Sequence, residues 1–140
     1  MIVVVSGYFD PIHVGHLEYL ERSKNLYGKE NYLICIVNND KQAILKKGKP
    51  FMSEQDRIKI LNAVKWVDEV VLSIDEDSSV CKTLEKIHKE KPFEIFAKGG
   101  DRYSNEIPEK KICDAHNIMI VDGLGEKIRA SSDLIKNAKD

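Results

Sequence analysis

Five short apolar runs alternate with helical patterns along the chain, and this alternation limits the fold more than any other feature of the sequence. Each run is rich in β-branched residues and is apolar at successive positions, as expected of a strand that is covered on both faces. The runs are residues 2–5, 32–37, 69–74, 94–98 and 118–121. We therefore expect an α/β fold: a single Rossmann-like, doubly wound domain over residues 1–140, with a mainly parallel five-stranded sheet.

The segments between these runs carry helix signals of unequal strength. Residues 14–27 place leucines near one face and end at a glycine, and residues 54–64 follow Ser53, a good N-terminal cap. Residues 38–51, which include the run KKGKP, are interpreted as a loop. Weaker helical patterns cover residues 79–90, 107–116 and 131–138.

The composition excludes several classes of protein. A chain of 140 residues that is 42% hydrophobic, with a net charge of −1, is expected to fold and lacks the basic surplus of a nucleic-acid binder. It has no apolar run long enough to cross a bilayer and no basic leader, so we expect a cytoplasmic protein with neither a membrane nor a nucleic acid as partner. Three cysteines that lie far apart are expected to be reduced thiols: Cys35, Cys81 and Cys113.

The residues that follow the predicted strands point to a phosphate site. In an open parallel sheet, ligands bind at the carboxyl ends of the strands. There the sequence places GYFDPIHVGH, NNDKQAILKKGKP, KGGDR and DGLGEKIRASSD. Each segment alone has a structural explanation, such as a cap, a solvated loop or a turn. Together they supply glycines, imidazoles, cations and hydroxyls at one sheet edge, which favours a polyphosphate ligand.

Other nucleotide and metal motifs are absent from the sequence. There is no GxxxxGK[ST] phosphate loop, and no GxGxxG follows the first strand, so a nicotinamide enzyme is disfavoured. No carboxylate, cysteine or further histidine follows His13 and His16 in a metal-ligand spacing, so we expect no protein-held metal site.

The segment GYFDPIHVGH resembles the HxGH signature of the cytidylyltransferase-like nucleotidyltransferase superfamily. This superfamily includes glycerol-3-phosphate cytidylyltransferase and the heptose-1-phosphate adenylyltransferase domain. The resemblance covers nearly the whole chain: KKGKPFMSEQDRIKILNAVKWVDEVV is similar to the lysine loop and arginine-bearing helix, FAKGGDRY to the KGGD turn, and RASSDLI to the start of the last helix. It implies that an acceptor phosphate attacks the α-phosphorus of a nucleoside triphosphate and releases pyrophosphate, without a covalent enzyme intermediate.

The resemblance also implies catalytic roles. His13 and His16 would donate to the α- and β-phosphate oxygens through imidazoles that can carry a positive charge near neutral pH. Lys46 or Lys47 would reach the α-phosphate and the acceptor phosphate from a loop that closes over both. Arg57 would fix that loop or bind the acceptor phosphate.

The same resemblance assigns the nucleotide-binding residues. Gly15 would let the nucleotide lie against the backbone, and Asp10 would shape the first turn, cap the helix or hold the nucleotide. Ala130 replaces the first hydroxyl residue of the last motif, and Lys127 or Arg129 would supply a charge that the family places elsewhere. The full set implied is Gly7, Tyr8, Phe9, Asp10, Gly15, Lys98, Gly99, Gly100, Asp101, Lys127, Arg129, Ala130, Ser131 and Ser132.

The identity of the substrates is left open by the sequence. CTP is placed slightly ahead of ATP because the KGxP run and the VDEVV strand fit the small cytidylyltransferases, whereas the KGGD turn is shared with the heptose adenylyltransferase. The expected acceptor is a small phosphorylated compound such as a polyol or sugar phosphate, with Mg²⁺ bound to the triphosphate, in a homodimer. Two alternatives are a non-catalytic nucleotide sensor and an aminoacyl-tRNA synthetase fragment; the latter is disfavoured without a tRNA-binding domain.

Overall fold

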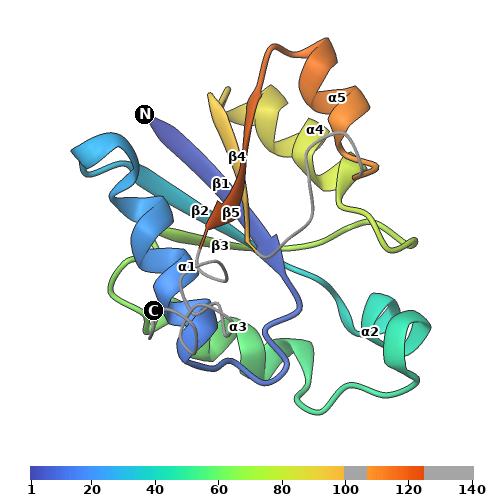
Figure 1. The fold of residues 1–140 in the computed structure, drawn as a ribbon. Coiled ribbons are helices and arrows are strands. Elements are labelled where there is room, and N and C mark those ends of the chain that lie inside the picture. The colour runs from blue at the N-terminus through green and yellow to red at the C-terminus, as the bar shows by residue number, and fades with distance from the viewer. Residues whose placement is uncertain (100–106, 125–140) are drawn as a thin grey trace, which may run out of the picture.

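A parallel sheet of five strands forms the centre of the molecule, in the order β3-β2-β1-β4-β5 (Figure 1). The computed structural model describes residues 1–99 and 107–124. Every neighbouring pair in this sheet is parallel, which confirms the predicted fold class. The strands are β1 (Ile2–Gly7), β2 (Tyr32–Val37), β3 (Glu69–Leu72), β4 (Ile95–Gly99) and β5 (Met119–Leu124).

Helices cover both faces of this sheet, because each central strand is apolar on both of its sides. Val3 and Val5 of β1 face one hydrophobic cluster, which includes Leu20, whereas Val4 faces another, which includes Leu84. The helices are α1 (Val14–Lys24), α2 (Asp40–Lys47), α3 (Glu54–Asn62), α4 (Cys81–Glu90) and α5 (Lys110–Ala115), with a short 3₁₀ turn η1 (Leu26–Gly28). In the part of the chain that the structure describes, no helix has the length and apolar character that a membrane span requires.

The segment interpreted as a loop between β2 and α3 contains helix α2, so this prediction is wrong. The Asn39 side chain accepts a hydrogen bond from the Gln42 backbone N–H, and the Gln42 side chain accepts one from the Asn39 N–H. The helix ends at Gly48, whose φ of 84° is the left-handed conformation that glycine adopts readily. This reciprocal cap and terminal glycine were readable signals in the sequence. Predicted helix 131–138 lies outside the described residues.

The strand order reverses next to β1. The chain moves from β1 outward to β2 and β3, and then crosses back so that β4 pairs with the other side of β1. Such a reversal leaves a crevice at the carboxyl ends of the two strands that flank it. The fold therefore directs ligand binding to the ends of β1 and β4.

Candidate nucleotide-transfer site

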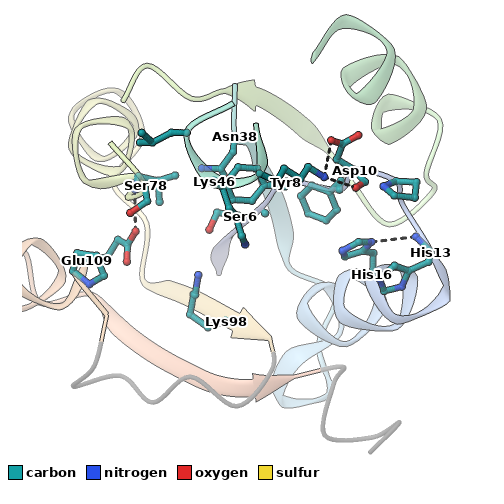
Figure 2. A pocket seen from close by; sticks show the side chains of 17 residues that line it. Ser6, Tyr8, Asp10, His13, His16, Asn38, Lys46, Ser78, Lys98 and Glu109 are labelled. Atoms are coloured by element: carbon teal, nitrogen blue, oxygen red, sulfur yellow. Dashed lines mark hydrogen bonds and ion pairs between the residues drawn. The ribbon is translucent and has the colours of Figure 1, made fainter. Parts of the chain in front are cut away.

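A pocket of about 710 Å³ opens at this edge of the sheet (Figure 2). Its size is within the range of small-molecule sites. Its lining comes from the ends of β1, β2 and β4, the start of α1, the end of α2, and the segments before α4 and α5. The lining residues are Ser6, Gly7, Tyr8, Phe9, Asp10, Pro11, His13, His16, Asn38, Leu45, Lys46, Lys47, Ser78, Val80, Lys98, Pro108 and Glu109.

The two histidines of HVGH form a capping box at the start of α1. His13 Nδ1 accepts a hydrogen bond from Gly15 N, and His16 Nδ1 accepts one from His13 N, each at 3.1 Å. A ring nitrogen that accepts a hydrogen bond carries no proton, so this network assigns the hydrogen of each neutral imidazole to Nε2. The cap thus leaves each ring with an Nε2–H donor in the lining of the pocket.

Gly15 and Gly7 make room for side chains of this site. A Cβ on Gly15 would lie 2.9 Å from His13 Cε1, so a residue without a side chain at this position leaves room for the His13 ring. A Cβ on Gly7 would lie 3.1 Å from the Phe9 ring. Phe9 is 2% exposed and meets His16 edge to face, with ring centroids 5.0 Å apart. Phe9 therefore supports the His16 ring from inside the protein.

His16 is a neutral donor. Burial and the neighbouring His13 ring lower the pKa of His16 from its ordinary value of 6.5 to about 4. The two rings are stacked with centroids 3.9 Å apart, where two positive charges would repel strongly. The expectation of a positively charged imidazole at neutral pH is therefore wrong for His16.

This shift predicts a pH dependence of stability. An unfolded His16 binds a proton near its ordinary pKa of 6.5, whereas the folded residue binds it near 4. Between these two pH values the unfolded state binds the proton more readily than the folded state. The contribution of His16 to the free energy of unfolding is therefore complete above pH 6.5 and is lost as the pH falls toward 4. Urea unfolding of the wild type and of His16→Gln, which keeps a capping acceptor, measures it. The free energy of unfolding should fall more steeply between these pH values in the wild type; parallel curves would contradict the assignment.

Asp10 organises the connection between α2 and α3 and does not cap α1. Its carboxylate accepts hydrogen bonds from Phe51 N at 2.8 Å and Met52 N at 2.6 Å, and Lys47 Nζ lies 2.9 Å from it. Burial alone would raise the pKa of Asp10, but the bonds from Lys47 and the two backbone N–H groups lower it below its ordinary value. The carboxylate is thus an ionised anchor, and the predicted capping role is wrong because His13 fills it.

The two adjacent lysines occupy the last turn of α2 and differ in their contacts. Lys47 Nζ lies 2.9 Å from both the Asp10 carbonyl oxygen and its carboxylate. Lys46 Nζ lies 4.6 Å from the centre of the Tyr8 ring, a cation–π contact. Lys98, at the end of β4, faces the same space (Figure 2). The structure therefore brings three predicted cations to one pocket, two of them from a helix end and not from the flexible loop expected.

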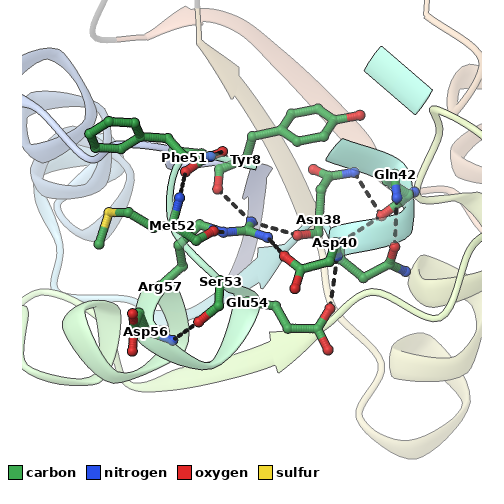
Figure 3. Close-up of polar contacts among 12 residues, drawn as sticks. Tyr8, Asn38, Asp40, Gln42, Phe51, Met52, Ser53, Glu54, Asp56 and Arg57 are labelled. Carbon is green, nitrogen blue, oxygen red and sulfur yellow. Dashed lines mark hydrogen bonds and ion pairs between the residues drawn. The ribbon is translucent and has the colours of Figure 1, made fainter. Parts of the chain in front are cut away.

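Arg57 is buried beneath the pocket. Its guanidinium donates to the carbonyl oxygens of Met52, Tyr8 and Asn38 and to the Asp40 carboxylate, at 2.7–3.0 Å (Figure 3). Its side chain is 0% exposed. Arg57 therefore joins the ends of β1 and β2 to the starts of α2 and α3. Of the two predicted roles, this position matches the fixing of the loop, and it offers no surface to an acceptor phosphate.

A family model described as cytidylyltransferase-like matches residues 4–136. The chain belongs to the cytidylyltransferase-like family. It is 37% identical over 115 residues to an FAD synthase from Methanothermus fervidus, covering 82% of this chain and 75% of that protein. It is 32% identical to a bifunctional protein HldE from Syntrophotalea carbinolica, covering 99% of this chain and only 27% of that protein.

A solved structure shares the fold of this cytidylyltransferase-like chain. It is the lipopolysaccharide core biosynthesis protein from Thermoplasma volcanium, with a TM-score of 0.70 and 25% identity, covering 89% of this chain and 97% of that one. Together with the family match, this likeness confirms the superfamily predicted from HVGH. The family match and the FAD synthase relative also confirm the general class of enzyme, a nucleotidyltransferase.

The remaining predicted site residues divide into two groups. Gly99 ends β4 beside the pocket. Outside the described residues lie Gly100, Asp101, Lys127, Arg129, Ala130, Ser131 and Ser132. Sequence reasoning missed Ser6, Asn38, Ser78 and Glu109 in the lining. Ser6 and Asn38 stand at the ends of predicted strands, which was a usable signal, whereas Ser78 and Glu109 lie in connections with no motif.

Metal ligands are not clustered in the part of the family domain that the structure describes. Within residues 1–99 and 107–124, no group of three or more histidine, cysteine, aspartate or glutamate side chains could hold a metal ion. Asp10, which lies three residues before His13 in the sequence, is already engaged by Lys47 and two backbone N–H groups. The described residues therefore offer no cage of protein ligands for a metal ion.

Proposed function

We propose that this enzyme transfers an adenylyl group from ATP to the phosphate of a small acceptor and releases pyrophosphate. The observation that carries the proposal is the pair of Nε2–H donors of His13 and His16 in one pocket with Lys46 and Lys98. Donors and cations that converge from a helix start, a helix end and a strand end fit a polyphosphate whose charge shifts during reaction. A site for simple nucleotide storage has no need of such an arrangement.

ATP is better supported than CTP as the nucleotide. FAD, the product named in the Methanothermus fervidus relative, is a flavin phosphate joined to an adenylyl group. The alternative raised by the KGGD turn, adenylyl transfer, therefore agrees with the relatives better than the cytidylyl transfer first favoured. By the same reasoning, flavin mononucleotide is the first acceptor to test. A sugar phosphate, which the KGGD turn implies, is the second, and neither relative named above points to a polyol phosphate.

The chain's own residues would act by alignment and charge stabilisation. His13 and His16 would donate from Nε2 to oxygens of the β-phosphate as it leaves, when negative charge builds on the pyrophosphate. Lys46 would sit near both the α-phosphate and the acceptor phosphate and so reduce their mutual repulsion. Mg²⁺ bound to the triphosphate would neutralise part of its charge, held by phosphate oxygens and water, as Mg²⁺ often is.

The two lysines give a prediction that separates their roles. We expect Lys46→Ala to lower kcat roughly tenfold to a hundredfold. The effect on stability should be small, because the Lys46 ammonium is exposed and pairs with no carboxylate in the part of the chain that the structure describes. Lys47→Ala should lower kcat and also cost about 1 kcal/mol or more of stability, because it removes the cation beside the buried Asp10 carboxylate. Steady-state kinetics, an ATP titration and urea unfolding measure all three effects.

Lys49→Ala is the matched control for this pair. Lys49 belongs to the same basic run but is absent from the pocket lining, so its loss should change neither kcat nor stability. Wild-type kcat in both Lys46→Ala and Lys47→Ala would show that this helix end is only a solvated surface.

A substrate panel tests the proposed function. Pyrophosphate release is measured with each of the four nucleoside triphosphates against flavin mononucleotide, a sugar 1-phosphate and glycerol 3-phosphate, with and without a chelator. We expect turnover with ATP and one of the first two acceptors, lost in excess chelator. Preference for CTP would overturn the adenylyl assignment, and nucleotide binding without any pyrophosphate release would favour the sensor alternative.

A further inference from the structure

The pocket extends well beyond the two histidines. In Figure 2, His13 and His16 lie at one side, Ser78 and Glu109 lie at the opposite side, and Lys46 stands between them. The proposed function assigns the triphosphate to the histidine side. The other side therefore has space and polar groups that the nucleotide phosphates do not use.

Tyr8 places an unsatisfied hydroxyl in the middle of this pocket. Its oxygen is buried, and among the described residues no group forms a hydrogen bond with it. By contrast, the buried Tyr19 hydroxyl donates to the Ala97 carbonyl oxygen at 2.5 Å. Burial raises the pKa of Tyr8 although the Arg57 charge lowers it, so the phenol stays protonated and can donate. A buried donor without a partner costs free energy until a ligand accepts its hydrogen bond.

Glu109 closes the far side of the pocket with a buried carboxylate. The residue is only 4% exposed, and its Oε2 accepts a hydrogen bond from Val80 N at 2.9 Å. A carboxylate has room for about four hydrogen bonds, and in the described part of the chain Val80 N–H is the one donor bonded to it. Because Glu109 lines the pocket, its remaining oxygen lone pairs are available to hydrogen-bond donors of a ligand.

The charges along the pocket favour one orientation of a bound acceptor substrate. Lys46 Nζ lies 4.6 Å from the centre of the Tyr8 ring, so an ammonium and a phenol are neighbours in the pocket lining. A phosphate would be attracted to this pair and repelled by Glu109. Hydroxyl or N–H groups at the other end of the same molecule would satisfy the Glu109 carboxylate.

We propose that the half of the pocket formed by Tyr8, Lys46, Ser78 and Glu109 is the acceptor compartment. Tyr8 O–H and Lys46 hold the acceptor's phosphate beside the α-phosphorus of the nucleotide, and Glu109 selects acceptors that carry hydroxyl or N–H donors away from their phosphate. This inference rests on the proposed function for the position of the nucleotide. It names the acceptor class as a phosphate monoester with a donor-rich far end.

Two variants and two probes test the compartment without relying on turnover. Dissociation constants of flavin mononucleotide and phenyl phosphate are measured by calorimetry, with α,β-methylene-ATP present to occupy the triphosphate side. Phenyl phosphate has no donor beyond its phosphate. Tyr8→Phe keeps the ring under Lys46 and should weaken both probes about tenfold. Glu109→Gln keeps an acceptor for Val80 N–H and should weaken flavin mononucleotide about tenfold while leaving phenyl phosphate unchanged.

Stability separates binding from a structural role. Tyr8→Phe removes an unpaired hydroxyl and should leave Tm unchanged or raise it, whereas Tyr19→Phe removes a paired one and should lower Tm. Unchanged affinity for both probes in Tyr8→Phe, or weakening of the ATP analogue instead, would overturn the inference. If both probes respond as expected but no triphosphate yields pyrophosphate, the compartment stands and the proposed transfer reaction fails.

Discussion

Replacement of His16 by alanine is expected to lower kcat by roughly 10²–10³, the loss typical of one preorganised donor to a developing oxyanion. The ring is fixed from three directions: by its hydrogen bond from His13 N, by stacking on His13, and by the edge of Phe9. A donor held in this way needs little rearrangement when charge builds on the leaving pyrophosphate. Because His16 stays neutral at pH 7, the loss reflects a missing hydrogen bond and not a missing charge.

Two further variants separate catalysis from the capping role of His16. His16→Gln restores an acceptor for the His13 N–H, so it should keep the stability of α1 while losing the imidazole donor. His116→Ala, at a histidine that does not line the pocket, is the matched control and should keep wild-type kcat. Near-normal turnover in His16→Ala with normal melting would contradict the catalytic assignment.

Arg57→Ala is expected to lower the free energy of unfolding by about 3–5 kcal/mol. The substitution leaves the Asp40 carboxylate without its cation and removes the donor to the carbonyl oxygens of Tyr8 and Asn38, which directly follow β1 and β2. Arg57→Lys keeps the charge but lacks the planar fork that reaches these groups together, so an intermediate loss is expected.

Urea unfolding compares these variants with Arg22→Ala, an exposed arginine of α1, which should stay within about 0.5 kcal/mol of the wild type. If Arg57 instead bound the acceptor phosphate, its loss would raise the acceptor KM and leave stability intact. A loss of stability below about 1 kcal/mol in Arg57→Ala would therefore contradict its role as a buried anchor.

The fold was predictable because its signal is local. A strand that is apolar on successive positions, as in Val3, Val4 and Val5, has to be covered on both faces, and the structure divides these residues between two clusters. Helix α2 was missed because its lysines and terminal glycine resemble a solvated loop. The cap formed by Asn39 and Gln42 nevertheless stabilises a helix over this segment.

The sequence predicted many of the residues in the site, but it predicted their roles less well. The pattern HVGH identifies two imidazoles at a helix start. A cap was only the structural alternative for such a histidine, and the reciprocal box between His13 and His16 was not predicted because histidine is not among the usual N-cap residues. Asp10 bonds to backbone N–H groups 41 and 42 residues away, a distance that no local pattern reveals. The burial of Arg57 likewise depends on how three separate segments meet.

The fate of labelled ATP phosphates tests the central claim most directly. The enzyme is incubated with flavin mononucleotide and with ATP labelled either at the α- or at the γ-phosphorus, and the products are separated. The account predicts that the α-label appears in the acceptor product and the γ-label in pyrophosphate, and that both products form more slowly in His16→Ala by the same factor. Release of the γ-label as free phosphate or its transfer to the acceptor, with the α-label left in ADP, would contradict nucleotidyl transfer at this site.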